Sequence, residues 1–237
     1  MVSIVLPAYK EEENLRHLLP RLNNELEKKN IDYEILVIDT MEAMDNTSQI
    51  CKDNNTYYYN RNGGNLYGDG IRTGISKAKG ESILLMDADG SHKIEDVLRL
   101  IDERKISNDD VIIGSRYIAG GNTDNNFILR FMSYVLNLTY RIVFKLNVKD
   151  VSNSFRIYDS HKLKNIKLEC NNFDIVEEIL IRLKLQYPTL KIKEIPISFE
   201  KRKHGESKRK LIKFIFSYLR TMRRLYMISI KGRRVDG

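Results

Sequence analysis

The chain has 237 residues, of which 42% are hydrophobic and 30% are charged, a composition typical of a soluble globular protein with a sizeable core. Its two cysteines exclude a disulfide scaffold or a cysteine-rich zinc module. There is no run of 18 apolar residues, and the N-terminus turns acidic by residue 11. We therefore expect a cytoplasmic protein without a spanning helix or a secretory signal.

The net charge of +8 is concentrated at one end of the chain. Residues 201–237 hold 13 of the 40 Lys and Arg but 2 of the 32 Asp and Glu, so this segment carries +11 and the remainder −3. The sequence thus combines a slightly acidic domain with a basic C-terminal tail.

In the first half, short β-branched runs alternate with segments whose apolar residues recur every three or four positions. This alternation predicts an α/β fold with an open, mostly parallel sheet and right-handed crossovers. Such sheets bind ligands beyond the carboxyl ends of their strands. The predicted strands are 2–6, 33–38, 56–59, 82–86 and 111–113.

The regular alternation of predicted strands and helices ends after residue 114. We expect an apolar helix over 127–144, an amphipathic helix over 173–185, and extended segments at 154–158 and 192–199. No linker rich in Pro, Gly or Ser separates the halves, so we expect one domain over residues 1–210 and a basic amphipathic helix over 211–237. The apolar side of that helix is predicted to hold Leu211, Ile212, Ile215, Phe216, Leu219, Met222 and Tyr226.

The sharpest chemical signal is Asp87-Ala88-Asp89, directly after the apolar strand at 82–86. Two carboxylates at this spacing, where a strand leaves the sheet, can share one hard divalent cation. Such a cation would neutralise a nucleotide diphosphate and stabilise the charge on a diphosphate leaving group. An Asx-rich turn is the alternative explanation for an isolated motif of this kind.

Other polar residues follow the neighbouring strands. Asp39 follows the second strand and would face the same crevice, either as an acceptor for a base or ribose or as a turn residue. The segment 7–11 offers a tyrosine ring and a carboxylate, and the glycine-rich run 63–70 fits a loop that approaches a ligand or an ordinary surface loop. That run matches neither a P-loop nor a dinucleotide fingerprint.

Six ordered blocks make the chain similar to a known family: VLPAYKEEENL, VID, YGDGIRTGISKAKGESILLMDADGSH, GSRYIAGG, SNSFRIYD and EIPISFEKRKHGESK. From Ile4 to about Lys210 the sequence resembles the family 2 glycosyltransferases of the GT-A fold, and among them the dolichyl- or polyprenyl-phosphate mannosyltransferases. The resemblance implies transfer of a hexose, mannose or glucose, from GDP-mannose or a UDP-hexose to a lipid phosphate.

The resemblance also implies roles for individual residues. Asp87 and Asp89 would hold Mg²⁺ or Mn²⁺ with Ser91 nearby, and Arg116, Arg130 and Lys208 would hold phosphates. A surface residue or ion-pair partner is the alternative for Arg116 and Arg130. The donor pocket would be lined by Pro7, Ala8, Tyr9, Glu11, Ile38, Asp39, Gly68, Arg72, Asp87, Ala88 and Asp89.

Two departures from the family pattern stand near the donor pocket. Thr40 replaces a second aspartate and the Gly-Ser turn after it is missing, although Asp39 and Asp45 remain. Lys10 stands where the family commonly has Asn. The first departure leaves the nucleotide open between GDP, UDP and another.

The acceptor decides whether a general base is needed. A lipid phosphate is already anionic, whereas a hydroxyl acceptor in polysaccharide or glycolipid synthesis must lose its proton to a carboxylate. Glu177 or Glu178 is the candidate base, with a solvated helix face as the alternative for both. We favour the phosphate acceptor because three cations suit a phosphate better than a neutral sugar.

The basic tail has three interpretations: it lies on an anionic bilayer, it binds nucleic acid, or its apolar stripe docks on the domain. We favour the membrane surface and expect no nucleic acid. A non-catalytic nucleotide-sugar or nucleic-acid binding module is the alternative from another functional class.

Overall fold

A computed structural model describes residues 1–200 and 211–235, and in the last helix it describes the side chains of residues 217–230. Its centre is a seven-stranded sheet in the order β3-β2-β1-β4-β7-β5-β8, in which only β7 runs antiparallel to its neighbours. The predicted α/β fold with a mostly parallel sheet is therefore confirmed. The strands are β1 (Val2–Pro7), β2 (Tyr33–Asp39), β3 (Tyr57–Asn60), β4 (Ser82–Leu85), β5 (Val111–Ser115), β7 (Arg156–Asp159) and β8 (Ile192–Pro196).

Helices cover both faces of this sheet, which is why its central strands are apolar without alternation. One core contains the leucines of α1 (Glu12–Lys28), all 5% exposed or less, together with α4 (Ile94–Ile106). The other core contains α3 (Tyr67–Lys77), α6 (Ser160–Lys164) and α7 (Ile175–Gln186). The short α2 (Thr47–Asp53) packs beside α1.

The parallel pairing of β1 with β2 and β4 brings three carboxyl ends to one edge of the sheet. Val5 is paired with Leu36 on one side and with Leu85 on the other. The residues after these strands therefore meet at that edge, as the sequence predicts.

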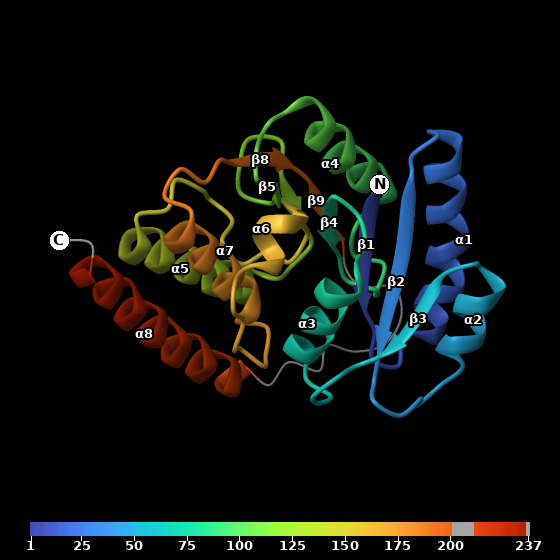
Figure 1. Cartoon of the computed structure of the whole chain (residues 1–237), viewed down its shortest axis with the longest axis horizontal. Coiled ribbons are helices and arrows are strands. Elements are labelled where there is room, and N and C mark those ends of the chain that lie inside the picture. Colours follow the sequence, from blue (N-terminus) through green and yellow to red (C-terminus); the bar gives the residue numbers. More distant parts are fainter. Residues whose placement is uncertain (201–210, 236–237) are drawn as a thin grey trace.

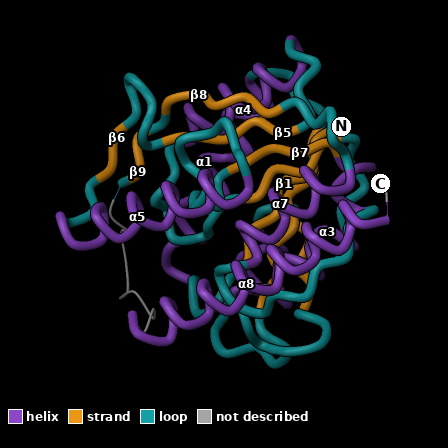
Figure 2. The backbone as a smooth tube through the Cα atoms, turned by 90° about the vertical axis from the view of Figure 1, so that its left-hand side faces the viewer, coloured by secondary structure: helices purple, strands orange, loops and turns teal. Residues whose placement is uncertain are grey.

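The second half of the chain builds the opposite end of the molecule. Figure 1 shows α1 and α2 at one end, and α5 (Phe127–Phe144) and α8 (Leu211–Val235) at the other. Figure 2 shows the strands edge to edge, with α5 and α8 toward the viewer. A two-stranded sheet of β6 (Asn122–Thr123) and β9 (Ser198–Phe199) completes this half.

Helix α5 corrects the expectation that no helix could span a membrane. By length and composition it is apolar enough to do so, with 11% of the window buried inside the structure. Its buried residues are Asn137 and Tyr140, and its exposed apolar side chains include Phe127, Ile128 and Phe131.

Helix α8 packs on the rest of the chain through one face of the segment whose side chains are described. The residues turned inward are Tyr218, Thr221, Leu225 and Ser229, each 5% exposed or less. Of the residues predicted on the apolar side, Met222 packs against the core, whereas Leu219 and Tyr226 are 56% and 47% exposed. The small hydroxyl residues Thr221 and Ser229 allow close packing, and they fall outside a hydrophobic count.

Candidate active site

Asp87 and Asp89 lie just beyond β4 at the crevice edge. Asp87 Oδ1 accepts hydrogen bonds from Tyr67 Oη at 3.3 Å and Ser154 Oγ at 3.2 Å. Asp89 Oδ1 accepts from the backbone N–H of Ser91 at 3.0 Å. Both carboxylates are thus oriented by neighbours from α3, from the loop before β7 and from their own turn.

The donor set at this turn fits a hard divalent cation. The turn carries two carboxylates, and the hydroxyl of Ser91, two residues after Asp89, is a buried oxygen with no hydrogen-bond partner among the described residues. Hard cations prefer such oxygen ligands and leave further positions to phosphates and water. Within the described parts of the chain, no group of three or more His, Cys, Asp or Glu is arranged to bind a metal. The site therefore fits a cation that is held jointly with a bound diphosphate.

His92 is packed behind this turn. Its ring stacks on Phe155 with centroids 4.3 Å apart and meets Phe199 edge-on, while its Nε2 lies 3.7 Å from Asp87 Oδ2. Its position agrees with the expectation of a loop residue near the cation site, away from any zinc cluster.

Asp39 ends β2 across the crevice and is 1% exposed. Its carboxylate accepts a hydrogen bond from Tyr58 Oη at 3.1 Å. Burial raises the pKa of Asp39, and the hydrogen bonds from Thr40 and Tyr58 oppose that rise only in part. A carboxyl held under these conditions can receive a hydrogen bond from a ligand hydroxyl or base.

The altered loop after Asp39 is held by its neighbours even without the Gly-Ser turn. Thr40 Oγ1 donates to Glu42 O at 2.6 Å, and Asn60 Nδ2 donates to Thr40 O at 2.7 Å. The backbone N–H of Met41 donates to Asn65 Oδ1 at 2.7 Å. Thr40 therefore connects the loop to β3, and Met41 connects it to the 63–66 segment.

The turn after β1 contains Lys10, the second departure from the family pattern. Lys10 has a φ of 56°, in the left-handed region where a residue such as Asn is favoured over Lys. Next to it, Glu11 accepts from Asn14 Nδ2 at 2.6 Å, and Asp45 accepts from the backbone N–H of Glu12 at 3.2 Å. Asp45 thereby fixes the altered loop against the start of α1.

Arg61 was not singled out from the sequence, yet it organises the back of the crevice. It is 6% exposed and donates to the carbonyls of Ala8, Asn65 and Leu66. It thus joins the turn after β1 to the glycine-rich loop. The signal available in the sequence was its position directly after a strand, which is shared by many structural residues.

Gly68 and Arg72, predicted to line the donor pocket, bind the 170–171 segment in this structure. The Gly68 N–H donates to Asn171 O at 2.8 Å, and a Cβ on Gly68 would come within 2.3 Å of the Cys170 carbonyl oxygen. Arg72 donates to Cys170 O, to Asn171 Oδ1 at 2.8 Å and to Asp69 at 2.6 Å. Their observed role is to hold α3 against a distant loop, which no local motif predicts.

The three cations expected to converge on a phosphate are not seen together. Arg116 is 8% exposed and forms a two-pronged ion pair with Asp150, with both contacts at 2.8 Å. Burial alone would raise the pKa of Asp150, but the charge and hydrogen bonds of Arg116 outweigh it and lower that pKa. Arg130 is exposed on the first turn of α5, and Lys208 lies outside the described residues.

Arg116 thus has the ion-pair partner that the sequence left open as its alternative, and its contact with a phosphate stays a prediction. Asp150 is 34 positions away along the chain, so the local sequence does not predict its ion pair with Arg116.

Glu177 and Glu178 correct the expectation of an amphipathic α7 with a solvated acidic face. Both are 0% exposed. Glu178 accepts hydrogen bonds from the backbone N–H groups of Glu169 and Cys170 at 2.9 and 2.7 Å, and from Arg182 and Arg224 at 3.0 and 2.9 Å. With four donors around it, Glu178 is a structural anchor.

Glu177 points into the core between helices. Burial raises its pKa to about 8, although the positive charge of Arg156 and a hydrogen bond from Tyr218 lower it. Tyr140 and Asp174 also interact electrostatically with the Glu177 carboxyl. A general base has to reach its substrate, and a residue enclosed in this way does not meet that condition.

Comparison with known proteins was made on sequence and on structure. A sequence profile described as glycosyl transferase family 2 matches residues 3–167. The chain is 32% identical over 231 residues to a dolichol-phosphate mannosyltransferase of Pyrococcus furiosus, covering 94% of this chain and 63% of that protein. The chain therefore spans less than two thirds of the length of that relative.

An undecaprenyl-phosphate mannosyltransferase of Micrococcus luteus is 30% identical over 221 residues, covering 87% of this chain and 86% of that protein. Among solved structures, glucosyl-3-phosphoglycerate synthase from Mycobacterium tuberculosis, in complex with Mn²⁺, UDP and glucosyl-3-phosphoglycerate, superposes with a TM-score of 0.72. That match has 14% identity and covers 94% of this chain and 77% of the other, which shows a shared fold.

Proposed function

The chain belongs to glycosyl transferase family 2, and from that premise we propose that it moves a hexose from a nucleotide sugar to a dolichyl or polyprenyl phosphate, with a divalent metal and with inversion. The chain is a glycosyltransferase related to polyprenyl-phosphate sugar transferases. The donor, mannose or glucose on GDP or UDP, and the metal, Mg²⁺ or Mn²⁺, are part of the proposal.

The observation that carries the proposal is the arrangement of Asp87 and Asp89 beside Ser91 at the crevice edge. These oxygens form a partial cation site that a diphosphate would complete. When bound, the cation would neutralise the diphosphate and favour its departure. Neighbouring glycosyltransferase structures contain UDP with Mn²⁺ or Mg²⁺, which supports the same arrangement here.

The residues of this chain would bind and orient the donor. Asp39 would receive a hydrogen bond from the base or ribose, and Arg61 would keep the surrounding loops in place. The acceptor phosphate oxygen would form a bond to the anomeric carbon as the bond to the diphosphate oxygen breaks. The electron pair would leave with the nucleoside diphosphate.

The position of the α7 glutamates supports a phosphate acceptor. A sugar hydroxyl would need a base in reach, and both candidates are enclosed in the protein. An anionic phosphate needs none. Arg130, exposed on α5, remains a cation that could attract such an acceptor.

A membrane-surface location is supported by the exposed apolar side chains of α5 and α8. Phe127 and Phe131 are 80% and 58% exposed, and Leu219 and Met227 on α8 are 56% and 49% exposed. Basic residues accompany them on α8, and helices of this composition lie at the interface of anionic bilayers.

The donor and the acceptor can be tested in sequence. First, thermal shifts with GDP-mannose, UDP-glucose and the free nucleotides, each with and without Mn²⁺, should identify one nucleotide sugar that stabilises the protein only with metal. Asp89→Asn should remove that shift, and Asp102→Asn, at an exposed site on α4, should keep it. Absence of any shift would favour a non-catalytic binding module.

Second, the identified donor should be incubated with undecaprenyl phosphate and with a glycolipid that offers only hydroxyls. Sugar on the lipid phosphate alone would support the proposal. Transfer to the hydroxyl acceptor alone would overturn it in favour of polysaccharide or glycolipid synthesis.

The membrane contact has its own test. Phe127→Ser with Phe131→Ser should reduce flotation with anionic vesicles, while Tyr57→Ser, an exposed aromatic on β3, should not. Equal flotation of all three proteins would contradict a role for α5 at the membrane.

A further inference from the structure

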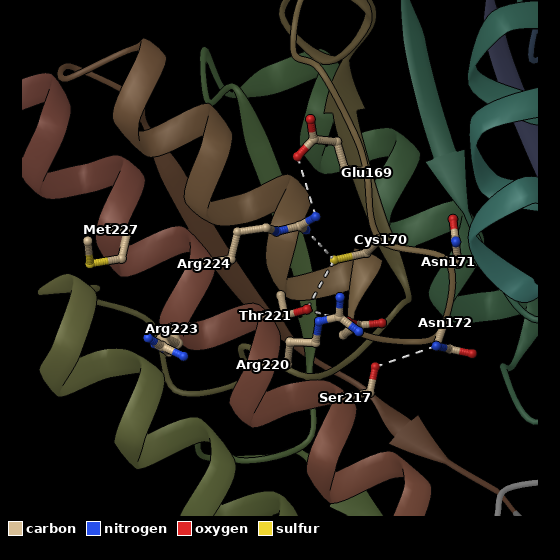
Figure 3. Close-up of a pocket in the computed structure, with 11 residues that line it drawn as sticks. Glu169, Cys170, Asn171, Asn172, Ser217, Arg220, Thr221, Arg223, Arg224 and Met227 are labelled. Atoms are coloured by element: carbon tan, nitrogen blue, oxygen red, sulfur yellow. Dashed lines mark hydrogen bonds and ion pairs between the residues drawn. The ribbon is translucent and has the colours of Figure 1, made fainter.

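A cavity of about 500 Å³ opens between α8 and the 169–172 segment, and neither Asp87 nor Asp89 lines it. Figure 3 shows Arg220 and Arg224 extending from α8 toward that segment. Polar side chains dominate its wall, namely Asn171, Asn172, Ser217, Arg220, Arg223 and Arg224.

One side of the cavity is fixed by a dense set of bonds. Arg224 donates to Glu178 and to Cys170 Sγ, both at 2.9 Å, and Thr221 Oγ1 donates to Asp174 Oδ2 at 2.5 Å. Because these groups are buried or part-buried, the wall is formed before any ligand arrives.

The acidic residues of the wall are already neutralised or covered. Glu169 pairs with Lys167, Arg182 and Arg224 at 3.1, 2.9 and 3.4 Å. Asp174 is 4% exposed and is turned toward Thr221.

Arg220 and Arg223 are in the opposite situation. Both are exposed, and neither forms a hydrogen bond or ion pair with any residue that the structure describes. Two guanidinium groups therefore border one cavity, with the amides of Asn171 and Asn172 as further donors. Their positive charge is not compensated by the described part of the wall.

We propose that this cavity binds a phosphate group through Arg220 and Arg223, carried either by a soluble phosphate ester or by a lipid headgroup. The planar fork of arginine suits two-pronged bonding to phosphate oxygens. The site does not depend on the proposed sugar transfer.

The same wall is connected to the catalytic side of the molecule. Asn171 accepts hydrogen bonds from Gly68 N–H and from Arg72, both at 2.8 Å. Phe173 stacks on Tyr67 with centroids 4.3 Å apart, and Tyr67 in turn donates to Asp87. A ligand in the cavity would thus contact a segment that supports the start of α3.

The test uses the full chain in EDTA, so that a phosphate held by metal does not interfere. Inorganic phosphate would be titrated at constant ionic strength while the backbone amide NMR signals of Asn171, Asn172 and Ser217 are followed. We expect saturable shifts at these positions, and a smaller shift at Gly68.

The decisive variant is Arg220→Lys with Arg223→Lys, which keeps the charge but removes the planar forks. It should weaken phosphate binding by about tenfold or more. Lys28→Gln with Lys29→Gln, which removes two charges at the end of α1, should leave the binding unchanged. Thermal unfolding of each variant checks that the fold is kept.

A second arm separates the two sources of phosphate. If inorganic phosphate gives no shift, flotation with phosphatidylcholine vesicles is compared with vesicles that also contain phosphatidylglycerol. Binding that needs the anionic lipid and is lost in the Arg220→Lys, Arg223→Lys protein would assign the site to a headgroup. The proposal is overturned if that variant behaves like the unaltered protein in both arms, because any attraction would then be diffuse.

Discussion

Two pairs of acidic residues, Asp87 with Asp89 and Glu177 with Glu178, are candidates for the chemistry in the sequence. The first pair follows β4 at the edge where three parallel strands end. The second pair lies inside α7, where both side chains are 0% exposed. The fold therefore places one pair at the edge of the sheet and encloses the other inside the protein.

The difference lies in what each carboxylate binds. Asp87 is oriented by two hydroxyls and Asp89 by one backbone N–H, an arrangement that positions the oxygens for a cation. Glu178 receives two backbone N–H groups and two arginines, which uses its accepting capacity for structure. Strand ends in α/β sheets leave such groups available, whereas a helix packed on both sides does not.

The largest effect is expected at the strand end. Asp89→Asn should lower kcat by about a hundred- to a thousandfold, as expected for loss of a group that stabilises transition-state charge. Stability should change little, since asparagine keeps the size of the side chain and can still accept the hydrogen bond from the Ser91 N–H. Transfer of radiolabelled sugar at saturating Mn²⁺ measures this, with Asp102→Asn as the matched control. Retained activity in Asp89→Asn would contradict a catalytic role for the strand-end pair.

Substitution of Glu178 should lower stability, in contrast to the loss of turnover expected at Asp89. Glu178→Gln removes the charge that two arginines share in a buried setting, which should cost roughly 3–5 kcal/mol of unfolding free energy. For a chain of this size, that corresponds to a fall in Tm of roughly 6–20 °C. Urea and thermal unfolding measure the change, with the exposed Glu81→Gln as control. A normal Tm with lost turnover would instead identify Glu178 as a catalytic base.

The pH dependence of the free energy of unfolding tests the buried state of Glu177. Its pKa is raised to about 8 by burial, from 4.5 in the unfolded chain. Unfolding therefore releases a proton between these values, so the free energy of unfolding should fall as pH rises from about 4.5 to 8.

Replacing Glu177 with Gln removes that ionisation. At pH 5 the variant and the unaltered protein should differ little, and by pH 8 the variant should be more stable by roughly 2–4 kcal/mol. Urea unfolding at pH 5, 6, 7 and 8 tests this, and Glu81→Gln should show no such divergence. Parallel pH profiles for the two proteins would mean that Glu177 is charged in the folded state.

The sequence predicted the sheet and the place of Asp87 and Asp89 at its edge because both depend on local signals. Buried strands appear as apolar runs, and the position of Asp87 and Asp89 after such a run already identifies the edge of the sheet. The buried leucines of α1 follow the same logic, since a period of 3.6 residues describes a helix with one packed face.

The partners of charged residues could not be predicted in this way. Arg116 meets Asp150 and Arg224 meets Glu178 across 34 and 46 positions, and pairings over such distances follow from the folded topology alone. The packing face of α8 could not be predicted either, because Thr221 and Ser229 pack inward while Leu219 and Tyr226, counted on its apolar side, are exposed. Close helix packing selects for small size as well as for apolar character.

The smallest expected effect concerns Tyr67, whose hydroxyl donates to Asp87 from α3. Tyr67→Phe keeps the ring and its stacking on Phe173 but removes the hydrogen bond at 3.3 Å. Ser154 still donates to the same oxygen, so Mn²⁺ affinity should fall by about tenfold or less, the low end of what loss of a ligand-orienting contact produces. Mn²⁺ titration in the presence of nucleotide, followed by electron paramagnetic resonance, measures this directly.

Tyr134→Phe, at an exposed tyrosine of α5, controls for the substitution itself. A weaker metal affinity with an unchanged Tm would show that Asp87 is positioned from outside its own turn. Unchanged affinity would mean that Ser154 and the turn suffice, and that the strand end needs less support than the comparison with α7 implies.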